Sequence, residues 1–416
     1  MLRPTTSLRA FRPVLLTVSL LTAGCSASFN PKPIESVPFR DRAITQERSN
    51  VRVTAAVPSR EETRELFDAR LYRRNIQPIW LEIHNGRDED IFFLPFGLDP
   101  EYYTPLETAY IHLGGQWDRD VGRYFYERGL DLPVSAGETV SGYLFTPLDE
   151  GTKAFNVDII SEDANIGFAF FVPVPGLRVD HQTVDWEAIY PGEEANLPAN
   201  ELIEVLEGFA CCTRDKKEKG TGDPLNLVVI GDLEDVYFAF VRAGWDETET
   251  INRGSLWKTM GSFFSGGEYR YSPVSGLYAF GRPQDVAFQK ARDNIHERNH
   301  LRLWLAPIRF EGKPVWMGQI SRDIGVRFTS KTITTHKVDP DVDETREYLI
   351  EDLAYSQGLT QFAYVEGVGA APIEAPRGNL TGDPYFTDGY RVVLWVSAEP
   401  VALDDVKFID WKQPHD

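Results

Sequence analysis

Cysteine is scarce in this sequence, which holds 3 in 416 residues. Two of them, Cys211 and Cys212, are neighbours, so a scaffold held by several disulfides is excluded and the fold must depend on its hydrophobic core. A disulfide between adjacent residues strains the peptide that joins them, so we expect a buried or weakly reactive pair of thiols. Two thiols also cannot form a structural zinc site without further ligands.

Basic residues are outnumbered: 43 Lys and Arg face 63 Asp and Glu, a formal net charge of −20. A chain this acidic repels polyphosphate, so we expect neither nucleic acid nor an anionic surface bound by charge alone as a partner. Nucleotide binding is not expected either. No glycine-rich phosphate loop follows the apolar run at Leu225–Ile230, and the acidic residues Asp232, Glu234 and Asp235 stand there instead.

Long apolar runs are also missing, and none reaches the roughly 20 residues that a membrane-spanning helix needs. A short run at residues 14–21 follows three arginines and ends in Leu21-Thr-Ala-Gly-Cys25, which resembles a bacterial lipobox. The resemblance implies that residues 1–24 are a lipoprotein signal peptide, that Cys25 is lipidated, and that the protein is anchored in the cell envelope. Ser26 favours the outer membrane in a source that has one. The alternative is a secretory signal with a chance cysteine.

The remaining chain divides into two folded parts. Residues 25–50, rich in proline and polar residues, suggest a lipidated tether. Residues 51–175 hold short alternating apolar and polar stretches between Gly, Pro and Asp turns, which is typical of an immunoglobulin-like β-sandwich. Residues 176–222 then form a connector, 223–400 a second domain and 401–416 a tail. We therefore expect a multi-domain α+β protein.

Helix signals occur at several places, including an acidic stretch around Glu201–Phe209 in the connector. Ser59 and Glu62 have capping-box spacing for a short helix in the first domain. In the second domain, apolar residues recur at helical spacing after Asp232, and Asp341 opens another such pattern. With several predicted strands around them, these two helices indicate an α+β domain built on a mixed sheet.

The second half of the chain also holds a series of short motifs. In order they are Gly222-Asp-Pro-Leu-Asn-Leu-Val-Val-Ile-Gly231, Ala243-Gly-Trp245, Pro273-Val-Ser275, Leu277-Tyr278, Gly281-Arg-Pro-Gln-Asp285, Ala287-Phe-Gln-Lys290, His300-Leu-Arg-Leu-Trp304, and His336-Lys-Val-Asp-Pro-Asp-Val-Asp343 with Arg346. Through them, roughly residues 200 to 400 resemble the LssY C-terminal domain family, named after a component assigned to type I secretion. The resemblance implies an envelope-associated α+β domain, often fused to membrane-embedded segments, without an established activity. A lipobox and a β-rich domain precede it here instead.

Residues 296–300 spell H-E-x-x-H, the signature of zinc proteases. That chemistry needs His296 and His300 one turn apart on a helix as ligands, with Glu297 as the general base. Arg298, however, puts a charge where the signature has an uncharged residue. From His300 onward the chain alternates like a strand. We therefore expect extended chain at His300 and a chance match to the signature.

An extended chain creates a different candidate site, because His300 and Arg302 then share one face of a sheet. His336 and Asp339 could approach that face, giving a possible catalytic set of His300, Arg302, His336 and Asp339. His300, His336, Asp339 and Asp341 could instead hold a divalent metal ion, the one cofactor that the sequence suggests. In the structural alternative, Asp341 caps a helix and Arg302 pairs with an aspartate.

These observations lead to two functional hypotheses. The first is a lipid-anchored, non-catalytic envelope protein that binds a protein or an envelope component beside a secretion or lipid-handling assembly. The second is an envelope hydrolase, metal-dependent if an ion is held, centred on His300, Arg302, His336 and Asp339. A zinc protease is its weaker variant. The lack of a complete catalytic set in the sequence favours the first hypothesis.

Overall fold

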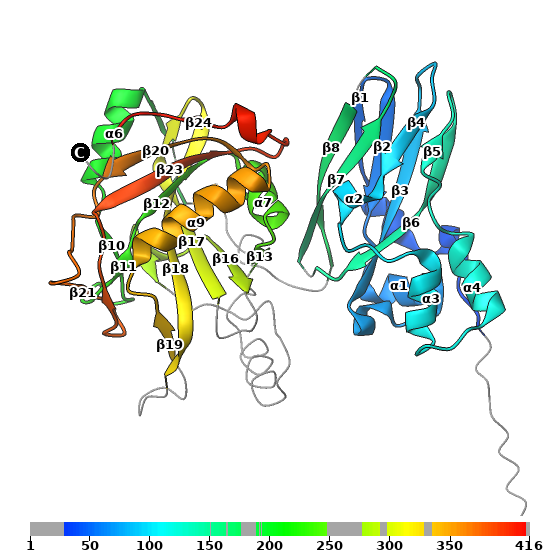
Figure 1. Ribbon diagram of the computed structural model, residues 1–416, viewed down its shortest axis with the longest axis horizontal. Helices are drawn as coiled ribbons and strands as arrows, with labels where there is room; N and C mark the ends of the chain where they lie inside the picture. The colour runs from blue at the N-terminus through cyan, green and yellow to red at the C-terminus, as the bar shows by residue number, and fades with distance from the viewer. Residues whose placement is uncertain are drawn as a thin grey trace, which may run out of the picture.

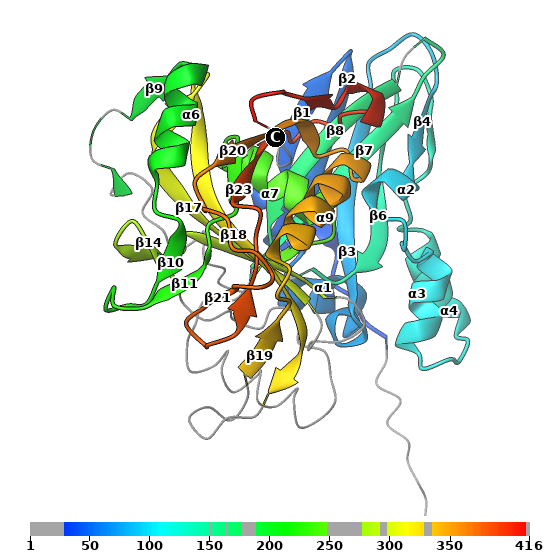
Figure 2. The same cartoon turned by 60° about the vertical axis from the view of Figure 1, so that its left-hand side comes forward.

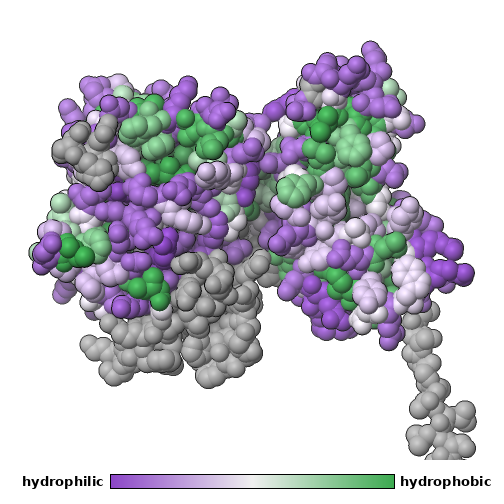
Figure 3. Space-filling view, in the orientation of Figure 1, coloured by the Kyte–Doolittle hydropathy of each residue, from purple (hydrophilic) through white to green (hydrophobic). Residues whose placement is uncertain are grey.

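The computed structural model has two lobes that lie side by side (Figure 1). It describes residues 29–149, 151–163, 165–175, 189–190, 192, 194–247, 277–291, 298–327 and 335–412. The expected signal peptide and Cys25 lie outside these residues. Within them, no helix combines the length and the apolar character needed to cross a bilayer. Hydrophilic residues cover much of the visible surface of both lobes (Figure 3), in keeping with the net charge of −20.

The N-terminal lobe contains two antiparallel sheets of four strands each, in the orders β1-β2-β3-β6 and β5-β4-β7-β8. Their bounds are β1 (Ile44–Arg48), β2 (Val51–Ala56), β3 (Ile76–Asn85), β4 (Ile91–Leu94), β5 (Pro133–Val134), β6 (Thr139–Pro147), β7 (Thr152–Ile160) and β8 (Asn165–Pro173). Alternate residues of β2, such as Val51 and Val53, are fully buried against Phe155 and Phe168 of the other sheet. The predicted period-2 pattern thus places one apolar core between the two sheets.

Short helices close the lower end of this lobe in Figures 1 and 2. They are α1 (Arg60–Phe67), α3 (Pro105–His112), α4 (Arg119–Tyr126) and the 3₁₀ turn η3 (Leu71–Arg74), whereas α2 (Pro95–Leu98) lies higher in the lobe against β7. The capping box predicted at Ser59 and Glu62 is confirmed at the start of α1. Helices α3 and α4 were not predicted. Their aromatic side chains, such as Phe125, pack against Phe67 of α1 and build a second core.

Part of the region 25–50, which we expected to be a tether, is folded. Residues 34–42 form two 3₁₀ turns, η1 (Ile34–Ser36) and η2 (Pro38–Arg42), and strand β1 follows. Phe39 is fully buried and packs against Trp80 and Tyr143. Proline and polar residues suggested a linker, but Val37 is buried in the same core as Phe39, and Ile34 packs against it.

The C-terminal lobe is built on a mixed sheet of ten strands, in the order β13-β16-β17-β18-β12-β23-β20-β24, with β19 beside β18 and β9 beside β17. The bounds are β9 (Ala195–Leu197), β12 (Leu227–Ile230), β13 (Asp246–Glu247), β16 (Val286–Ala291), β17 (Arg298–Phe310), β18 (Lys313–Arg327), β19 (Thr335–Val338), β20 (Leu359–Glu366), β23 (Tyr390–Val396) and β24 (Lys407–Phe408). The sheet curls into a half-barrel (Figures 1 and 2).

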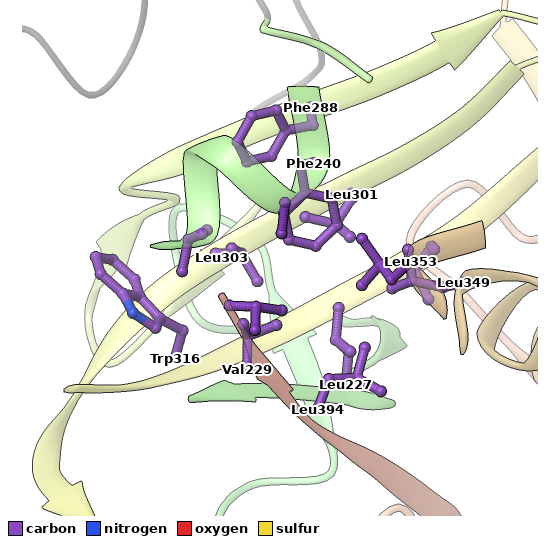
Figure 4. Packing of buried hydrophobic residues seen from close by; sticks show 14 of the residues in the cluster. Leu227, Val229, Phe240, Phe288, Leu301, Leu303, Trp316, Leu349, Leu353 and Leu394 are labelled. Atoms are coloured by element: carbon purple, nitrogen blue, oxygen red, sulfur yellow. The ribbon is translucent and has the colours of Figure 1, made fainter. Parts of the chain in front are cut away.

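Helices cover both faces of this sheet. The two predicted helices, α7 (Leu233–Arg242) and α9 (Val342–Tyr355), pack on one face against residues such as Leu301 and Leu303 (Figure 4). Helix α6 (Ala199–Gly208), expected in the connector, packs on the opposite face against Val228 and Trp304. Successive residues of a strand point to opposite faces, so Leu303 and its neighbour Trp304 belong to different cores.

Two smaller sheets flank the half-barrel. One joins β10 (Cys212–Arg214), β11 (Thr221–Pro224), β14 (Tyr278–Ala279) and β15 (Arg282–Pro283), and the other joins β21 (Arg377–Gly378) and β22 (Pro384–Tyr385). Together with the mixed sheet and its helices they make a mixed α/β lobe.

The lobes meet where α7 contacts strands β7 and β8. The rings of Phe171 and Tyr237 lie 5.2 Å apart across this junction. Arg242 donates to the side chain of Asn156 at 3.2 Å and to the carbonyl of Gln357 at 3.1 Å. Burial lowers the pKa of Arg242 to about 10, so the arginine remains charged at neutral pH.

Candidate functional site

His300 lies in strand β17, between Gln289 of β16 and Ser321 of β18. The prediction that the chain is extended at this position is therefore confirmed. A helix carrying the H-E-x-x-H motif cannot include a residue that is paired on both sides in a sheet. His296 and Glu297 lie outside the described residues.

His300 faces away from the leucine core and forms a pair with Asp323 of β18. Its Nε2 lies 2.6 Å from Oδ2 of Asp323 and donates to it, because a carboxylate can only accept. The Nε atom of Arg298 lies 3.9 Å from the same oxygen. His300 is 6% exposed and Asp323 3% exposed, so the pair lies in the protein interior.

Two further arginine–glutamine contacts extend this buried polar face. Arg298 donates to Oε1 of Gln289 at 2.6 Å, and Arg302 donates to Oε1 of Gln319 at 2.7 Å. The predicted sharing of one face by His300 and Arg302 is confirmed, since both have partners on neighbouring strands of that face. The amide of Gln319 is one partner of Arg302, whose charge also acts on the carboxyl group of Asp223.

Burial controls the charges on this face. It lowers the pKa of His300 to about 4, and the positive charges of Arg298 and Arg302 act in the same direction, against the opposing effect of Asp323. Burial also raises the pKa of Asp223, which accepts a hydrogen bond from Asn379 at 2.8 Å. At neutral pH the imidazole is therefore neutral, and it is bonded to a carboxylate.

The other predicted members of the cluster lie around the turn from β19 into α9. The backbone of His336 pairs with Val326, and its side chain is outside the described part of the structure. Asp339 accepts from the backbone N–H of Asp341 at 3.1 Å. Asp341 in turn accepts from the N–H groups of residues 343 and 344, which confirms the predicted helix cap. Among the described residues, no three His, Cys, Asp or Glu side chains gather as metal ligands would.

A second feature lies on the α6 side of the sheet, at the adjacent cysteines. Cys211 and Cys212 are joined by a disulfide, so the expected pair of thiols is wrong. The Cα atoms are 3.8 Å apart. The sulfur of Cys212 lies 3.7 Å from the hydroxyl of Tyr385. Strain in the joining peptide was the reason to expect thiols, and contacts with distant parts of the chain outweigh that local preference.

Arg391 of β23 holds the chain just before the two cysteines. It is fully buried and donates to the backbone carbonyls of Phe209 at 3.0 Å and Ala210 at 2.8 Å, directly before the disulfide. It also donates to the carbonyls of Leu225, Leu206 and Gly367. Burial lowers the pKa of Arg391 to about 10, so this guanidinium is charged, and the partners that it has among the described residues are peptide carbonyls.

A pocket of about 350 Å³ opens beside this turn. Its walls include Phe209 and Phe280, whose rings meet edge to face at 5.4 Å, together with Tyr278 and the buried Cys212. The pocket is completed by Ala210, Arg214, Glu218, Leu225, Ala279 and Gly281. Apolar and aromatic walls with a few polar groups are typical of ligand pockets.

Residues 204–390 match the family model described as LssY C-terminus. This part of the chain is an LssY C-terminal domain. The match confirms the resemblance drawn from the sequence motifs and leaves the β-rich N-terminal lobe unassigned. No curated protein matches the chain.

The LssY C-terminal domain contains both features, the buried polar face and the pocket. Sequence reasoning missed Asp323, the partner of His300, although a signal for it existed. In β18 the polar residues Gln319, Ser321 and Asp323 fall at every second position after the apolar run at residues 315–317. That alternation marks a polar stripe on one face, which is where the partners of His300 and Arg302 lie.

Proposed function

We propose that this protein is a lipid-anchored, non-catalytic binding protein of the bacterial cell envelope. Its LssY C-terminal domain receives a protein or envelope component in the pocket beside Cys212. The observation that carries the proposal is the pocket itself, because it presents exposed aromatic surface at Phe280 next to the charged side chains of Arg214 and Glu218. Such a site suits an apolar or ring-shaped group with a polar group attached to it.

The buried polar face supports a binding role over a catalytic one. A catalytic histidine must touch its substrate, whereas His300 and Asp323 are almost completely buried and bonded to each other. A structural role explains the same contacts. His300 bonds to one oxygen of Asp323, and Gln289 and Gln319 each accept a hydrogen bond from an arginine beside it.

Support for lipid anchoring comes from the lipobox and from where the folded chain begins. Phe29 already packs on Tyr124, with ring centroids 5.1 Å apart. Only a few residues then separate Cys25 from the N-terminal lobe. The two antiparallel sheets of that lobe suit the immunoglobulin-like sandwich that we predicted, a fold common in cell-surface proteins. We propose that it holds the LssY C-terminal domain at the membrane, on the outer membrane of a source that has two.

Site-specific photo-crosslinking in cells tests the pocket. A photoreactive phenylalanine analogue at position 280 should give a discrete adduct, and Tyr278→Asp on the same wall should abolish it. The matched control is the same analogue at Tyr355, an aromatic residue of α9 that is 76% exposed. Identical adducts from both positions, or none from position 280, would contradict the proposed binding site.

Metabolic labelling tests the anchor separately. The wild-type chain should incorporate labelled fatty acid and sediment with membranes, and Cys25→Ser should lose both properties. An unlabelled, freely soluble wild-type protein would disprove the anchoring.

A second candidate function is an envelope hydrolase, and the hydrogen bond between His300 and Asp323 favours it. A carboxylate that orients a histidine is a recurrent arrangement in hydrolases. Catalysis would require the polar face to open to a substrate. Elemental analysis of the purified protein, with His300→Ala beside it, distinguishes a metal-dependent enzyme: a bound metal that is lost in the variant would support this candidate.

A further inference from the structure

An arginine-rich segment stands out in this acidic chain. Residues 60–74 contain five arginines in a protein whose net charge is −20. Four of them, Arg64, Arg70, Arg73 and Arg74, line a pocket of about 460 Å³ together with Asp68 and His112. We call this the arginine pocket. A smaller pocket of about 160 Å³ beside it shares three of these arginines and adds Arg60 and Glu61.

The backbone brings these arginines together. Helix α1 ends at Asp68 and η3 ends at Asn75, and both residues have left-handed backbone conformations, with φ of 45° and 57°. The chain therefore turns sharply twice within a few residues. Leu66 and Phe67 of α1, with Leu71 of η3, are buried in the core of the lobe. Since these apolar side chains point inward, the charged residues between them lie at the surface.

Three of the four acidic residues of the same segment bond to groups outside it, and the fourth, Glu61, lines the smaller pocket. Glu62 caps α1 and pairs with Arg42 at 2.7 Å, and Glu65 pairs with Lys32 at 2.7 Å. Asp68 accepts a hydrogen bond from the backbone N–H of Asn30 at 2.9 Å.

The arginines, by contrast, keep their charge available. Within the described part of the chain, no ion pair or side-chain hydrogen bond occupies Arg64, Arg70, Arg73 or Arg74. Four guanidinium groups around one hollow repel one another, and Asp68 is the one carboxylate among the residues that line it. The arrangement suits a ligand that carries negative charge.

We propose that the arginine pocket binds the phosphate groups of anionic membrane lipids. Guanidinium groups bind phosphate oxygens in pairs of parallel hydrogen bonds, which a pocket with several arginines can supply from more than one side. His112 adds a ring that can donate to the same ligand. Its pKa is lowered by burial and by the charge of Arg74, against the effect of Asp68, and a bound phosphate would raise it.

The position of the pocket in the chain selects a lipid over a soluble phosphate compound. Asn30 bonds to Asp68 on the pocket wall, and Cys25 lies five residues before it. Five extended residues span at most about 18 Å. An acylated Cys25 would therefore hold the arginine pocket next to the lipid headgroups. This last step rests on the proposed anchoring. It also explains how a chain that is repelled overall by an anionic surface binds one at a single place.

Vesicle flotation tests the proposal with the mature chain from Ser26 onward, which keeps every described residue and carries no acyl group. We expect it to bind vesicles of phosphatidylglycerol and phosphatidylcholine, and not phosphatidylcholine alone. Arg70→Ser with Arg73→Ser should weaken this binding about tenfold or more. The matched control is Arg119→Ser with Arg123→Ser, which removes the same charge from exposed positions on the nearby α4.

Each outcome decides the question. Selective loss in the pocket variant, with an upward shift of the His112 pKa on binding, supports the proposal. Equal losses in both variants would mean unspecific attraction and would overturn it, as would no binding at all. Binding of soluble glycerol phosphate without binding of vesicles would identify a soluble ligand and also overturn it. Because the protein tested has no acyl chain, failure here is distinct from failure of the anchor, which fatty-acid labelling reports.

Discussion

His300 and Asp323 form a closed pair, with 2.6 Å between Nε2 and Oδ2 in the interior of the curled sheet. The sequence presented His300 as the end of a protease signature, and its surroundings instead make it a neutral hydrogen-bond donor. The pair is therefore best understood as part of what holds strands β17 and β18 together. The binding surface that we propose for the domain is the pocket on the α6 side.

Replacing His300 should reduce stability. His300→Ala leaves the buried Asp323 carboxylate without its closest partner, and we expect a loss of about 2–4 kcal/mol in the free energy of unfolding. Urea denaturation measures this loss. The control is His84→Ala, at a partly exposed strand position in the other lobe, which should change stability by no more than about 0.5 kcal/mol. Equal effects of the two substitutions would contradict a structural role for the pair.

The same histidine should make stability depend on pH. Its folded pKa of about 4 lies below the value of about 6.5 for an unfolded histidine. As pH falls through this window, His300 becomes protonated in the unfolded chain but stays neutral in the folded protein. The contribution of His300 is therefore complete above about pH 6.5 and declines towards pH 4, by about 3 kcal/mol in total. Unfolding of wild type and His300→Gln across this range isolates the contribution, and parallel curves would refute it.

Substitution of Arg391 should reduce the stability of the protein more than substitution at most other positions. Arg391→Met removes the donor shared by five carbonyls and leaves them buried, so we expect a loss of about 3–5 kcal/mol. Chemical denaturation provides the measurement, with Arg52→Met at an exposed position of β2 as the control. Because Arg391 also holds the Phe209–Ala210 turn, its loss should weaken crosslinking from position 280. Retention of full stability would show that these carbonyls find other donors.

The disulfide between Cys211 and Cys212 should resist alkylation until it is reduced. Peptide mass spectrometry without a reductant should find neither residue modified, and reduction before alkylation should modify both. The loop that it closes is minimal, so replacing both cysteines with serine should cost only about 1 kcal/mol. Alkylation of the native, unreduced protein would restore the original expectation of two thiols.

Local patterns in the sequence predicted local features correctly. The alternation after His300 gave the strand, and the spacing of Ser59 and Glu62 gave the capping box of α1. The same spacing precedes α3, where Thr104 and Glu107 form a capping box. These features depend on neighbours a few residues apart, which the sequence displays directly.

Features that depend on distant contacts could not be predicted. Asp323 meets His300 only because β17 and β18 pair in one particular register. Arg391 reaches carbonyls more than 160 residues away along the chain. The arginine pocket could not be predicted for another reason. The net charge of −20 averages over the chain, whereas binding depends on which charges the fold leaves unpaired.

The central claim, that the polar face around His300 is closed interior and not a reaction site, is tested most directly by nuclear magnetic resonance of its imidazole. Of the 7 histidines, His300 can be assigned by its absence from the His300→Gln spectrum. We predict a neutral ring protonated at Nε2, without an inflection between pH 8 and pH 5, as a pKa of about 4 requires. An inflection near pH 6.5 with rapid solvent exchange would contradict the claim and make the hydrolase the leading candidate.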